Sequence, residues 1–409
     1  MQTLFSRSTC CALTSIAVLW LAACETSRDV VVNPPAPDSV IAGLLEASVA
    51  TTLGAPFASL TADELARFTT GQQEFEAVET VAEGLGPVFN EASCASCHAM
   101  PVGGTNGRKE TRFGTTTNGV FDPMTALGGS LIQDHSIGPP FSPEVVPATA
   151  TITAHRITTP LFGLGLVDAV PDGELLALAR LEAISSPRTA GTPNLVSEIL
   201  TGRTRVGRFG WKAQVPTLFQ FSGDAYVNEM GITNPEFPDE NCPQGDCQLL
   251  AQNPAPGLND DGTGVREFTD FMTMLAPPPR GAVTSQVVAG GTIFVAIGCA
   301  NCHTPALATG PSPIAALSRK AFRPFSDFLL HDMGSLGDGI VQGTSTERQM
   351  RTAPLWGIAS RPALLHDGRA TTIDAAIRAH DGQGGNARDR FAGLSPQART
   401  ALLAYVNSL

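Results

Sequence analysis

The sequence predicts a mainly α-helical fold, built from two related modules with long irregular loop inserts. A short pattern, Cys-x-x-Cys-His, occurs at residues 94–98 and again about 200 residues later at 299–303. Apolar residues at helical spacing recur between stretches that contain most of the 41 glycines and 31 prolines. A chain of 409 residues is long enough for two or three domains, each with its own core.

Cys-x-x-Cys-His is the attachment signature of c-type haem. Two thiols on one side of a helical turn can form thioether bonds to one porphyrin, and the following histidine can bind its iron as proximal ligand. A thioredoxin-like redox pair or half of a zinc site would use similar residues, but zinc needs four close ligands in each place. We therefore expect two covalently bound haems in cytochrome-c-like modules. The predicted haem-binding residues are Cys94, Cys97, His98, Cys299, Cys302 and His303.

Composition and charge restrict the classes of partner. The formal net charge of −12 argues against nucleic acid as a partner and is compatible with a basic redox protein. Two of the nine cysteines, Cys242 and Cys247, flank a short loop that contains Pro243 and Gly245. We expect them to form a small disulfide in an oxidising compartment, with a redox-active dithiol as the alternative.

The N-terminal residues indicate export. Residues 1–23 carry Arg7 and then an apolar run that is too short for a membrane-spanning helix. The run ends in Leu-Ala-Ala-Cys, which resembles a bacterial lipobox with Cys24 as the lipidated first mature residue. An ordinary cleavable signal peptide is the alternative. Glu25, by its resemblance to known lipoproteins, suggests the outer membrane, so we expect a periplasmic protein whose membrane contact is its N-terminal lipid.

The remaining elements follow along the chain. Residues 24–40 form a Pro-rich tether, and helical patterning begins near Ile41. Thr61-Ala62-Asp63-Glu64 has the form of a capping box and opens a helix. Residues 103–150 are rich in Gly, Thr and Pro and predict loops with short strands, and 233–264 predicts a second irregular insert.

Later helices are predicted from apolar spacing. A helix from 395 to 409 has Ser395 as its N-cap and Pro396 in its first turn. We place an N-terminal haem domain at 41–264 and a C-terminal cytochrome-c-like domain at 265–409. The other predicted helices span 167–184, 195–200, 265–275 and 283–297, and residues 373–379 form an amphipathic stretch before His380.

The repeat extends beyond the two haem motifs, and its copies differ at one position. Pro-Leu-aromatic-Gly occurs at 160–163 and at 354–357, and a Thr follows six residues after both Trp211 and His366. His380 follows His366 by fourteen residues, whereas the same offset from Trp211 reaches Ala225, which cannot bind iron. An internal duplication is therefore predicted, with one haem closed by two protein ligands and the other open or weakly capped.

Longer stretches resemble a known family. These stretches are residues 84–90, 207–213, 229–234, 330–334 and 365–370. By them the chain resembles the bacterial di-haem oxidoreductases, a family also called thiol oxidoreductases, over nearly the whole mature sequence. More remotely it is similar to the di-haem cytochrome c peroxidases.

The resemblance implies roles for individual residues. In the peroxidases the C-terminal iron is bound by a Met that follows the histidine of a His-Asp-Gly motif by fourteen residues. Here that position is His380, which implies that His303 and His380 both bind the C-terminal iron. Two imidazole ligands would lower the reduction potential of that haem. Trp211 would connect the two haems electronically, and Glu229 would shuttle a proton at the peroxide pocket. A core aromatic and an ordinary ion pair are the alternatives for these two residues. The peroxidases also hold an interdomain calcium ion, whose ligands we cannot place here.

The distal ligand of the N-terminal haem stays open. His135, His155, Met230 or no residue at all could cap that iron.

The expected function is that of an exported di-haem c-type oxidoreductase. Electrons from a small redox protein, a cytochrome c or a cupredoxin, would enter at the C-terminal haem, and the N-terminal haem would reduce peroxide or a related small oxidant. The alternatives are an electron-transfer cytochrome without catalysis, and an oxidase of a thiol, an organic molecule or a protein.

Overall fold

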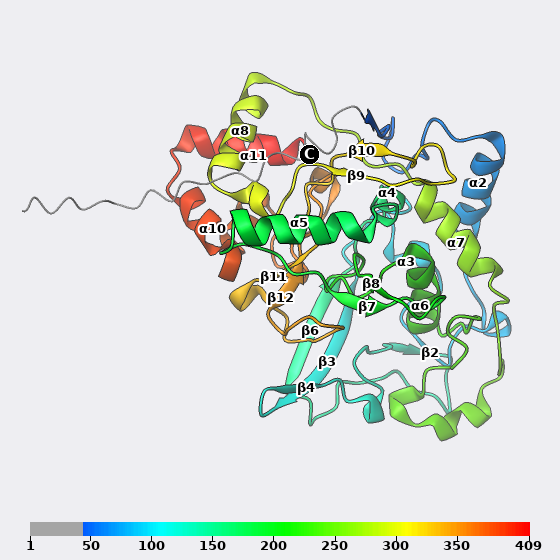
Figure 1. Cartoon of the computed structure of the whole chain (residues 1–409). Helices are drawn as coiled ribbons and strands as arrows, with labels where there is room; N and C mark the ends of the chain where they lie inside the picture. The colour runs from blue at the N-terminus through cyan, green and yellow to red at the C-terminus, as the bar shows by residue number, and fades with distance from the viewer. Residues whose placement is uncertain (1–43) are drawn as a thin grey trace, which may run out of the picture. The chain divides into compact units, whose positions relative to one another are not determined.

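The computed structural model describes residues 44–409, which belong to one compact unit (Figure 1). The predicted signal peptide, Cys24, the tether and the start of helical patterning near Ile41 lie outside the described residues. Within the described part of the chain, no helix is long and apolar enough to cross a membrane.

Helices make up most of the regular structure, as the sequence predicts. Short 3-10 helices connect them, for example Pro243–Gly245 and Ile358–Ser360. The helices are α2 (Ala62–Glu76), α3 (Cys94–Cys97), α4 (Leu164–Asp168), α5 (Asp172–Ser185), α6 (Leu218–Met230), α7 (Thr263–Met274), α8 (Ser285–Ala296), α9 (Ile373–Ala379), α10 (Gly385–Ala392) and α11 (Pro396–Asn407).

The strands are short and form small sheets. In the largest hydrogen-bonded pair, β3 and β6 run antiparallel with Lys109 opposite Ile157, and β4 extends the sheet in the order β4-β3-β6 (Figure 1). The strands are β1 (Leu45–Glu46), β2 (Val88–Phe89), β3 (Lys109–Thr117), β4 (Val120–Asp122), β5 (His135–Ser136), β6 (Ile152–Ile157), β7 (Leu195–Ser197), β8 (Thr204–Val206), β9 (Leu307–Ala308), β10 (Lys320–Phe322), β11 (Leu330–Asp332) and β12 (Gln349–Arg351).

Side-chain caps set several helix starts where the sequence predicts them. The Thr61 hydroxyl accepts from the Glu64 amide, while the Glu64 carboxylate accepts from the Thr61 amide, so the capping box of α2 is confirmed. Ser395 caps α11 with Pro396 in its first turn, as predicted.

Two predicted helices are wrong. The stretch 195–200 begins with β7, which pairs with β8 in a hairpin. Leu195, Ile199 and Leu200 are all exposed, so no buried apolar face is available to stabilise a six-residue helix. The predicted helix 167–184 is two helices, α4 and α5, because Pro171 ends the first segment and stands as the N-cap of the second.

Two other expectations also need correction. Residues 45–46 near the predicted helical start form the strand β1. The helix α6 and the nine-residue strand β3 were not predicted as such.

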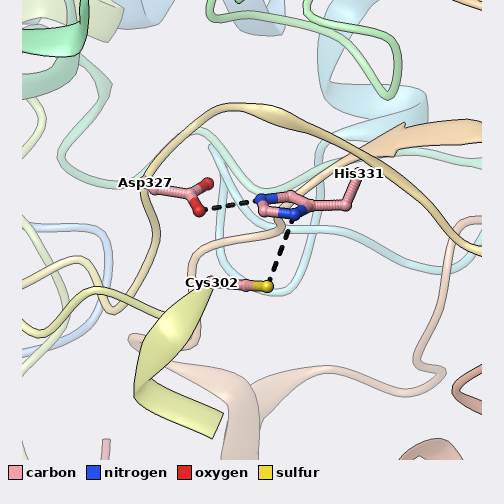
Figure 2. A group of neighbouring side chains, drawn as sticks. All are labelled: Cys302, Asp327 and His331. Carbon is pink, nitrogen blue, oxygen red and sulfur yellow. Dashed lines mark hydrogen bonds and ion pairs between the residues drawn. The ribbon is translucent and has the colours of Figure 1, made fainter. Parts of the chain in front are cut away.

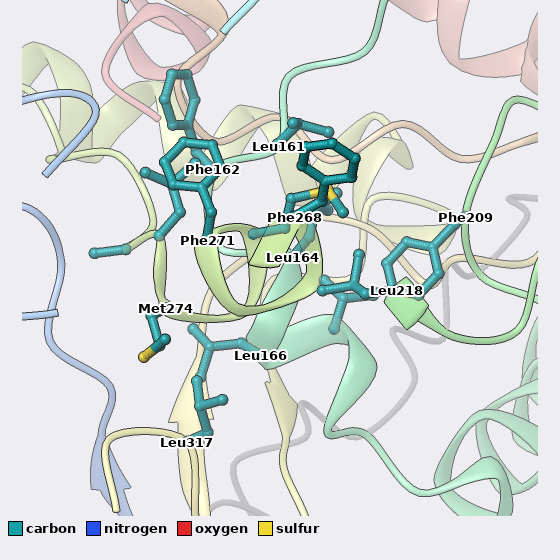
Figure 3. Close-up of a cluster of buried hydrophobic side chains, with 14 of the residues drawn as sticks. Leu161, Phe162, Leu164, Leu166, Phe209, Leu218, Phe268, Phe271, Met274 and Leu317 are labelled. Carbon is teal, nitrogen blue, oxygen red and sulfur yellow. The ribbon is translucent and has the colours of Figure 1, made fainter. Parts of the chain in front are cut away.

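The buried apolar side chains form two main clusters, one behind each Cys-x-x-Cys-His motif. The first gathers residues of α2, α4, α6 and α7, including Leu166, Phe268 and Phe271 (Figure 3), and Cys94 packs against it. The second gathers residues of α8, α9, α10 and α11, and Cys299 packs against it. Each motif is thus held on its own hydrophobic core.

A glycine lies where helices cross in each cluster. A Cβ on Gly71 of α2 would lie 2.2 Å from the carbonyl oxygen of Glu267 in α7. A Cβ on Gly290 of α8 would lie 2.0 Å from the carbonyl oxygen of Ala401 in α11. The two helix pairs can approach this closely only because these positions carry no side chain.

Substitution of these glycines tests the crossing. We expect Gly71→Ala and Gly290→Ala each to destabilise the protein by about 1–3 kcal/mol, because the added methyl group forces the helices apart. Gly173→Ala in α5 is the control, since a Cβ there meets no atom within 4 Å. Thermal unfolding of the purified variants measures the effect. Equal melting temperatures for all three variants would contradict this account of the packing.

Candidate functional site

The first motif opens onto a cavity. Cys94, Cys97 and His98 line a cavity of about 410 Å³, and the β3–β6 sheet and α6 supply further walls. Burial raises the pKa of Cys97 to about 12 and raises that of Cys94 as well. A reactive redox pair needs a lowered thiol pKa, so these two thiols do not suit a thioredoxin-like role. A cavity beside both thiols and the histidine does suit a large flat group attached to them.

His98 is held as a neutral ring without a conventional partner. Its ring lies 5.8 Å, between centroids, from that of Phe75 in the last turns of α2. Burial lowers the pKa of His98 to about 4, although backbone groups of Gly104 and Thr159 oppose the effect. Among residues 44–409, no group lies at hydrogen-bonding geometry to its buried Nδ1 atom. The neutral ring can therefore offer a lone pair to a metal.

Glu229 borders the same cavity from the last turn of α6. Its Oε2 atom accepts a hydrogen bond of 2.7 Å from the Asn90 side-chain amide. Burial, and then the charge of Glu110, raise the pKa of Glu229 to about 7, while Asn90 and Arg112 oppose the shift. The carboxyl group can therefore both hold and release a proton near neutral pH.

Trp211 also lines the cavity, and it is fixed at its polar end. The indole Nε1 donates a hydrogen bond of 2.9 Å to the carbonyl oxygen of Ile157 at the end of β6. Its ring meets that of His366 edge-on, with 6.3 Å between centroids. Trp211 thus touches the first site and also a residue of the C-terminal half.

The three candidate caps of the first iron lie in different surroundings. Met230 is buried, lines the cavity, and places its sulfur 3.9 Å from that of Cys94. His135 is exposed, pairs with Asp134 and stacks on Phe89. The exposed His155 lies on β6 with its Nδ1 atom 3.2 Å from the Thr111 hydroxyl. Of these three side chains, Met230 alone borders the cavity.

The second motif faces another histidine. The ring centroids of His303 and His380 are 6.4 Å apart. The Nδ1 atom of His303 donates to the carbonyl oxygen of Phe325 at 3.0 Å, and that of His380 donates to Ala376 at 2.8 Å. A carbonyl oxygen only accepts, so each ring keeps its Nε2 lone pair free. Such backbone bonds orient histidines that bind metals.

The separation of the two rings fits one metal ion between them. With metal–imidazole bonds of about 2.1 Å and a ring centre about 1.1 Å behind each nitrogen, two opposed imidazoles place their centres about 6.4 Å apart. Burial lowers the pKa of His303 to about 4 and also lowers that of His380, so both rings are neutral. The side chains of the second motif therefore fit a haem with iron bound by His303 and His380.

A buried polar group adjoins the second motif. Figure 2 shows the His331 ring between Cys302 and Asp327, with its Nδ1 atom 3.5 Å from the Cys302 sulfur and its Nε2 atom 2.8 Å from Asp327 Oδ2. The ligand atoms of these three residues lie within 4.8 Å of one another. A sulfur and nitrogen donor set does not suit calcium, so this group does not account for the calcium ion that the peroxidase resemblance implies.

The remaining cysteine pair lies apart from both motifs. Cys242 and Cys247 form a disulfide bond. Its loop contacts the segment next to the cavity, because the Gln244 amide donates to Glu144 and the Gln244 side chain donates to the carbonyl oxygen of Leu127.

Sequence reasoning missed several polar residues around Glu229. Asn90 ends a stretch that carries the family resemblance, but nothing in its spacing assigns it a partner. Arg112 lies on the unpredicted strand β3 and forms an ion pair with Glu110. Asp224 lies five residues before Glu229 on the unpredicted helix α6, and burial raises its pKa to about 6. Helical periodicity in residues 218–230 could have predicted the helix α6 and thereby the position of Asp224.

Comparison with known proteins places much of the chain in one family. A family model described as "Di-haem oxidoreductase, putative peroxidase" matches residues 148–409, which is more than half of the chain. The matched span includes the second haem motif, Trp211, Glu229 and His380, and it begins after the first motif. No match was found among curated proteins.

Solved structures give weaker similarities. A hydrazine synthase from Kuenenia stuttgartiensis is 14% identical, with 99% of this chain and 100% of that chain covered and a TM-score of 0.37. A MauG-like protein associated with microbial copper homeostasis is 13% identical, with coverages of 88% and 94% and a TM-score of 0.40. The diheme peroxidase BthA from Burkholderia thailandensis is 15% identical, with coverages of 90% and 94% and a TM-score of 0.39. At these identities and scores we base no conclusion on the three similarities.

The buried His366 beside Trp211 predicts an acid-sensitive fold. Burial lowers the pKa of His366 to about 4, below the value of about 6.5 in an unfolded chain. The folded protein therefore favours the neutral ring, and its stability falls as the pH drops from about 6.5 towards 4. We expect the loss from this residue to reach about 3 kcal/mol at most.

Unfolding at pH 7.5 and at pH 4.5 measures this dependence. His366→Gln should lose less stability between the two values than the natural protein does. An identical pH dependence in the natural protein and in His366→Gln would contradict the assignment.

Proposed function

Because this chain belongs to the di-haem oxidoreductase family, we propose that it is an exported c-type enzyme that reduces peroxide or a related small oxidant. The observation that supports the proposal is the difference between the two motifs. His303 faces a second histidine at the distance of two ligands on one metal, whereas His98 faces a cavity bordered by an acid of raised pKa. A six-coordinate iron suits electron transfer, and an open iron admits a small oxidant.

The residues of the first site have distinct parts in this reaction. The haems would supply the redox chemistry, with electrons entering at the C-terminal haem and leaving to the oxidant at the N-terminal haem. Glu229 would take a proton from one peroxide oxygen and return it to the other, so that the O–O bond breaks as water departs. Asn90 orients the Glu229 carboxyl group through its hydrogen bond. Two protons and two electrons reduce one peroxide to two water molecules.

Trp211 would connect the two haem sites electronically. Its hydrogen bond to Ile157 fixes the indole at the cavity, and its edge contact with His366 links it to the C-terminal half. We assign Trp211 the electronic bridge between the two haem sites.

We further propose that the two modules arose by internal duplication. Gly71 and Phe75 of α2 have the same four-residue spacing as Gly290 and Phe294 of α8. In each pair the glycine lies at the crossing with the last helix of its module, and the phenylalanine ring lies near the motif histidine, at 5.8 Å from His98 and 6.4 Å from His303.

Corresponding turns support the same proposal. Gly163 and Gly357 both adopt a left-handed conformation before a short helix. The Gly163 amide donates to Leu275 after α7, and the Gly357 amide donates to Leu409 after α11. By these correspondences α7 belongs with the first module, so the boundary lies between α7 and α8 rather than at the predicted 264/265.

The proposal also includes the cellular location of the protein, its electron donor and a calcium ion. The N-terminal motif of residues 21–24 supports export and lipidation at Cys24, which would anchor the protein to the outer membrane from the periplasmic side. The net charge of −12 supports a basic cytochrome c or cupredoxin as electron donor. A calcium ion between the modules stays part of the proposal on the peroxidase resemblance alone.

Glu229→Gln tests the acid. Because the amide cannot exchange a proton, we expect peroxide turnover with a reduced cytochrome to fall by about 10²–10⁴-fold. Glu91→Gln should have a much smaller effect, since Glu91 pairs with Arg108 at the cavity border and is about one third exposed. Steady-state kinetics of both variants, each with two haems by absorption, measure the difference. Equal turnover by Glu229→Gln and the natural protein would remove Glu229 from the mechanism.

His380→Met tests the second ligand. A thioether in place of an imidazole should raise the midpoint potential of the C-terminal haem, because imidazole stabilises the oxidised iron better. His135→Met, at an exposed position, should leave both potentials unchanged. A redox titration followed by absorption gives the result. An unchanged potential in His380→Met would exclude His380 as a ligand.

A further inference from the structure

Two arginines on one segment of the C-terminal half, one buried and one half-buried, have no acidic partner among residues 44–409. Arg351, at the end of β12, is 7% exposed, and Arg361 follows ten residues later after the 3-10 helix Ile358–Ser360. Among residues 44–409, no carboxylate lies within ion-pair distance of either guanidinium group. An unpaired buried charge costs several kcal/mol, so a partner is expected.

The contacts of Arg351 are to neutral groups. Its Nε atom donates to the carbonyl oxygen of Gly210 at 2.7 Å and its Nη1 atom to that of Thr352 at 3.1 Å, while the guanidinium lies over the Phe328 ring. The carboxylate whose charge reaches Arg351 is that of Asp327. Asp327 already accepts hydrogen bonds on both oxygens, one of them from His331. Arg351 therefore keeps an uncompensated positive charge.

Arg361 has even fewer partners. Its Nη2 atom donates to the carbonyl oxygens of Pro354 and Trp356, at 2.7 and 3.0 Å. Its buried Nε atom has no hydrogen-bond partner among residues 44–409. Burial lowers the pKa of both arginines to about 10, and the positive charge of Arg361 also lowers the pKa of Arg351. An anionic partner would relieve the cost of burying either guanidinium group.

The segment lies against the second haem motif. Leu355, which follows one of the carbonyl acceptors of Arg361, packs against the hydrophobic cluster that also holds Cys299 and Ala300. Ile358 is a buried member of that cluster. On the other side, the Arg351 amide donates to the carbonyl oxygen of Trp211. The segment that carries the two arginines thus lies between Trp211, at the first cavity, and the core that would surround the C-terminal haem.

Haem carries two propionate side chains, which are carboxylates, and arginine binds carboxylates strongly and with two parallel hydrogen bonds. We propose that Arg351 and Arg361 bind the propionate groups of the C-terminal haem. The proposal rests on the proposed function, because it requires a haem at His303 and His380. It also gives the two arginines an effect on the reaction, since a nearby positive charge disfavours oxidised iron and raises the potential at which the haem accepts electrons.

Redox titration of full-length protein at pH 8 tests the proposal. In Arg351→Gln and Arg361→Gln, with two haems present, the midpoint potential of the C-terminal haem should fall, and the double variant should show the larger shift. Arg361→Lys keeps the charge and should recover most of the potential. Arg323→Gln is the control, because Arg323 is 41% exposed and pairs with Glu46, so its removal should not shift the potential.

Haem content, measured as pyridine haemochrome, separates the possible failures. A natural protein with fewer than two haems would contradict the proposed function itself. Two haems with an unshifted potential in both Gln variants would overturn the propionate assignment alone. If the Gln variants lose the second haem but Arg361→Lys retains it, the result supports an ion pair between the arginines and the propionates. If Arg361→Lys also loses the second haem, only packing matters, and the propionate assignment is overturned.

Discussion

The arrangement depends on two half-buried imidazoles, those of His303 and His380, whose ring centres lie 6.4 Å apart. Each donates its Nδ1 hydrogen to a backbone carbonyl. These two bonds fix the tautomer of both rings and leave the Nε2 lone pair of each free. Around the first motif, His98 lines a cavity that Ala225 of α6 also borders. Under the proposed duplication, Ala225 would stand where the second motif has His380.

The framework itself is simple to explain physically. Near each motif a helix crosses another at a glycine, α2 crossing α7 at Gly71 and α8 crossing α11 at Gly290, and a phenylalanine four residues later lies near the motif histidine. Residues three and four apart share one face of a helix, so a single face makes both contacts. The β3–β6 sheet lines the cavity at the first motif, and the disulfide loop contacts the segment next to that cavity.

Helix caps and apolar spacing, which act over a few residues, predicted several of the helices. The Thr61 and Ser395 caps and the helices predicted at 265–275 and 283–297 were correct, because capping and apolar spacing act within a few residues. The stretch 195–200 was wrong because cross-strand pairing with β8, rather than an apolar helix face, stabilises it. The sheet β3–β6 was missed because its two strands lie far apart in the sequence. At the site, residue spacing predicted the motifs and His380, whereas only the fold shows that Asn90 bonds to Glu229 and that the charge of Arg112 acts on Glu229.

The difference between the two irons can be measured directly by electron paramagnetic resonance of the protein, with and without an added small ligand such as cyanide. The account predicts a low-spin bis-imidazole signal from the His303 iron that cyanide leaves unchanged. It also predicts a second signal, from the His98 iron, that changes when cyanide binds, at least once the C-terminal haem is reduced. Two low-spin signals that both stay unchanged in every redox state would contradict it, because both irons would then be closed to small oxidants.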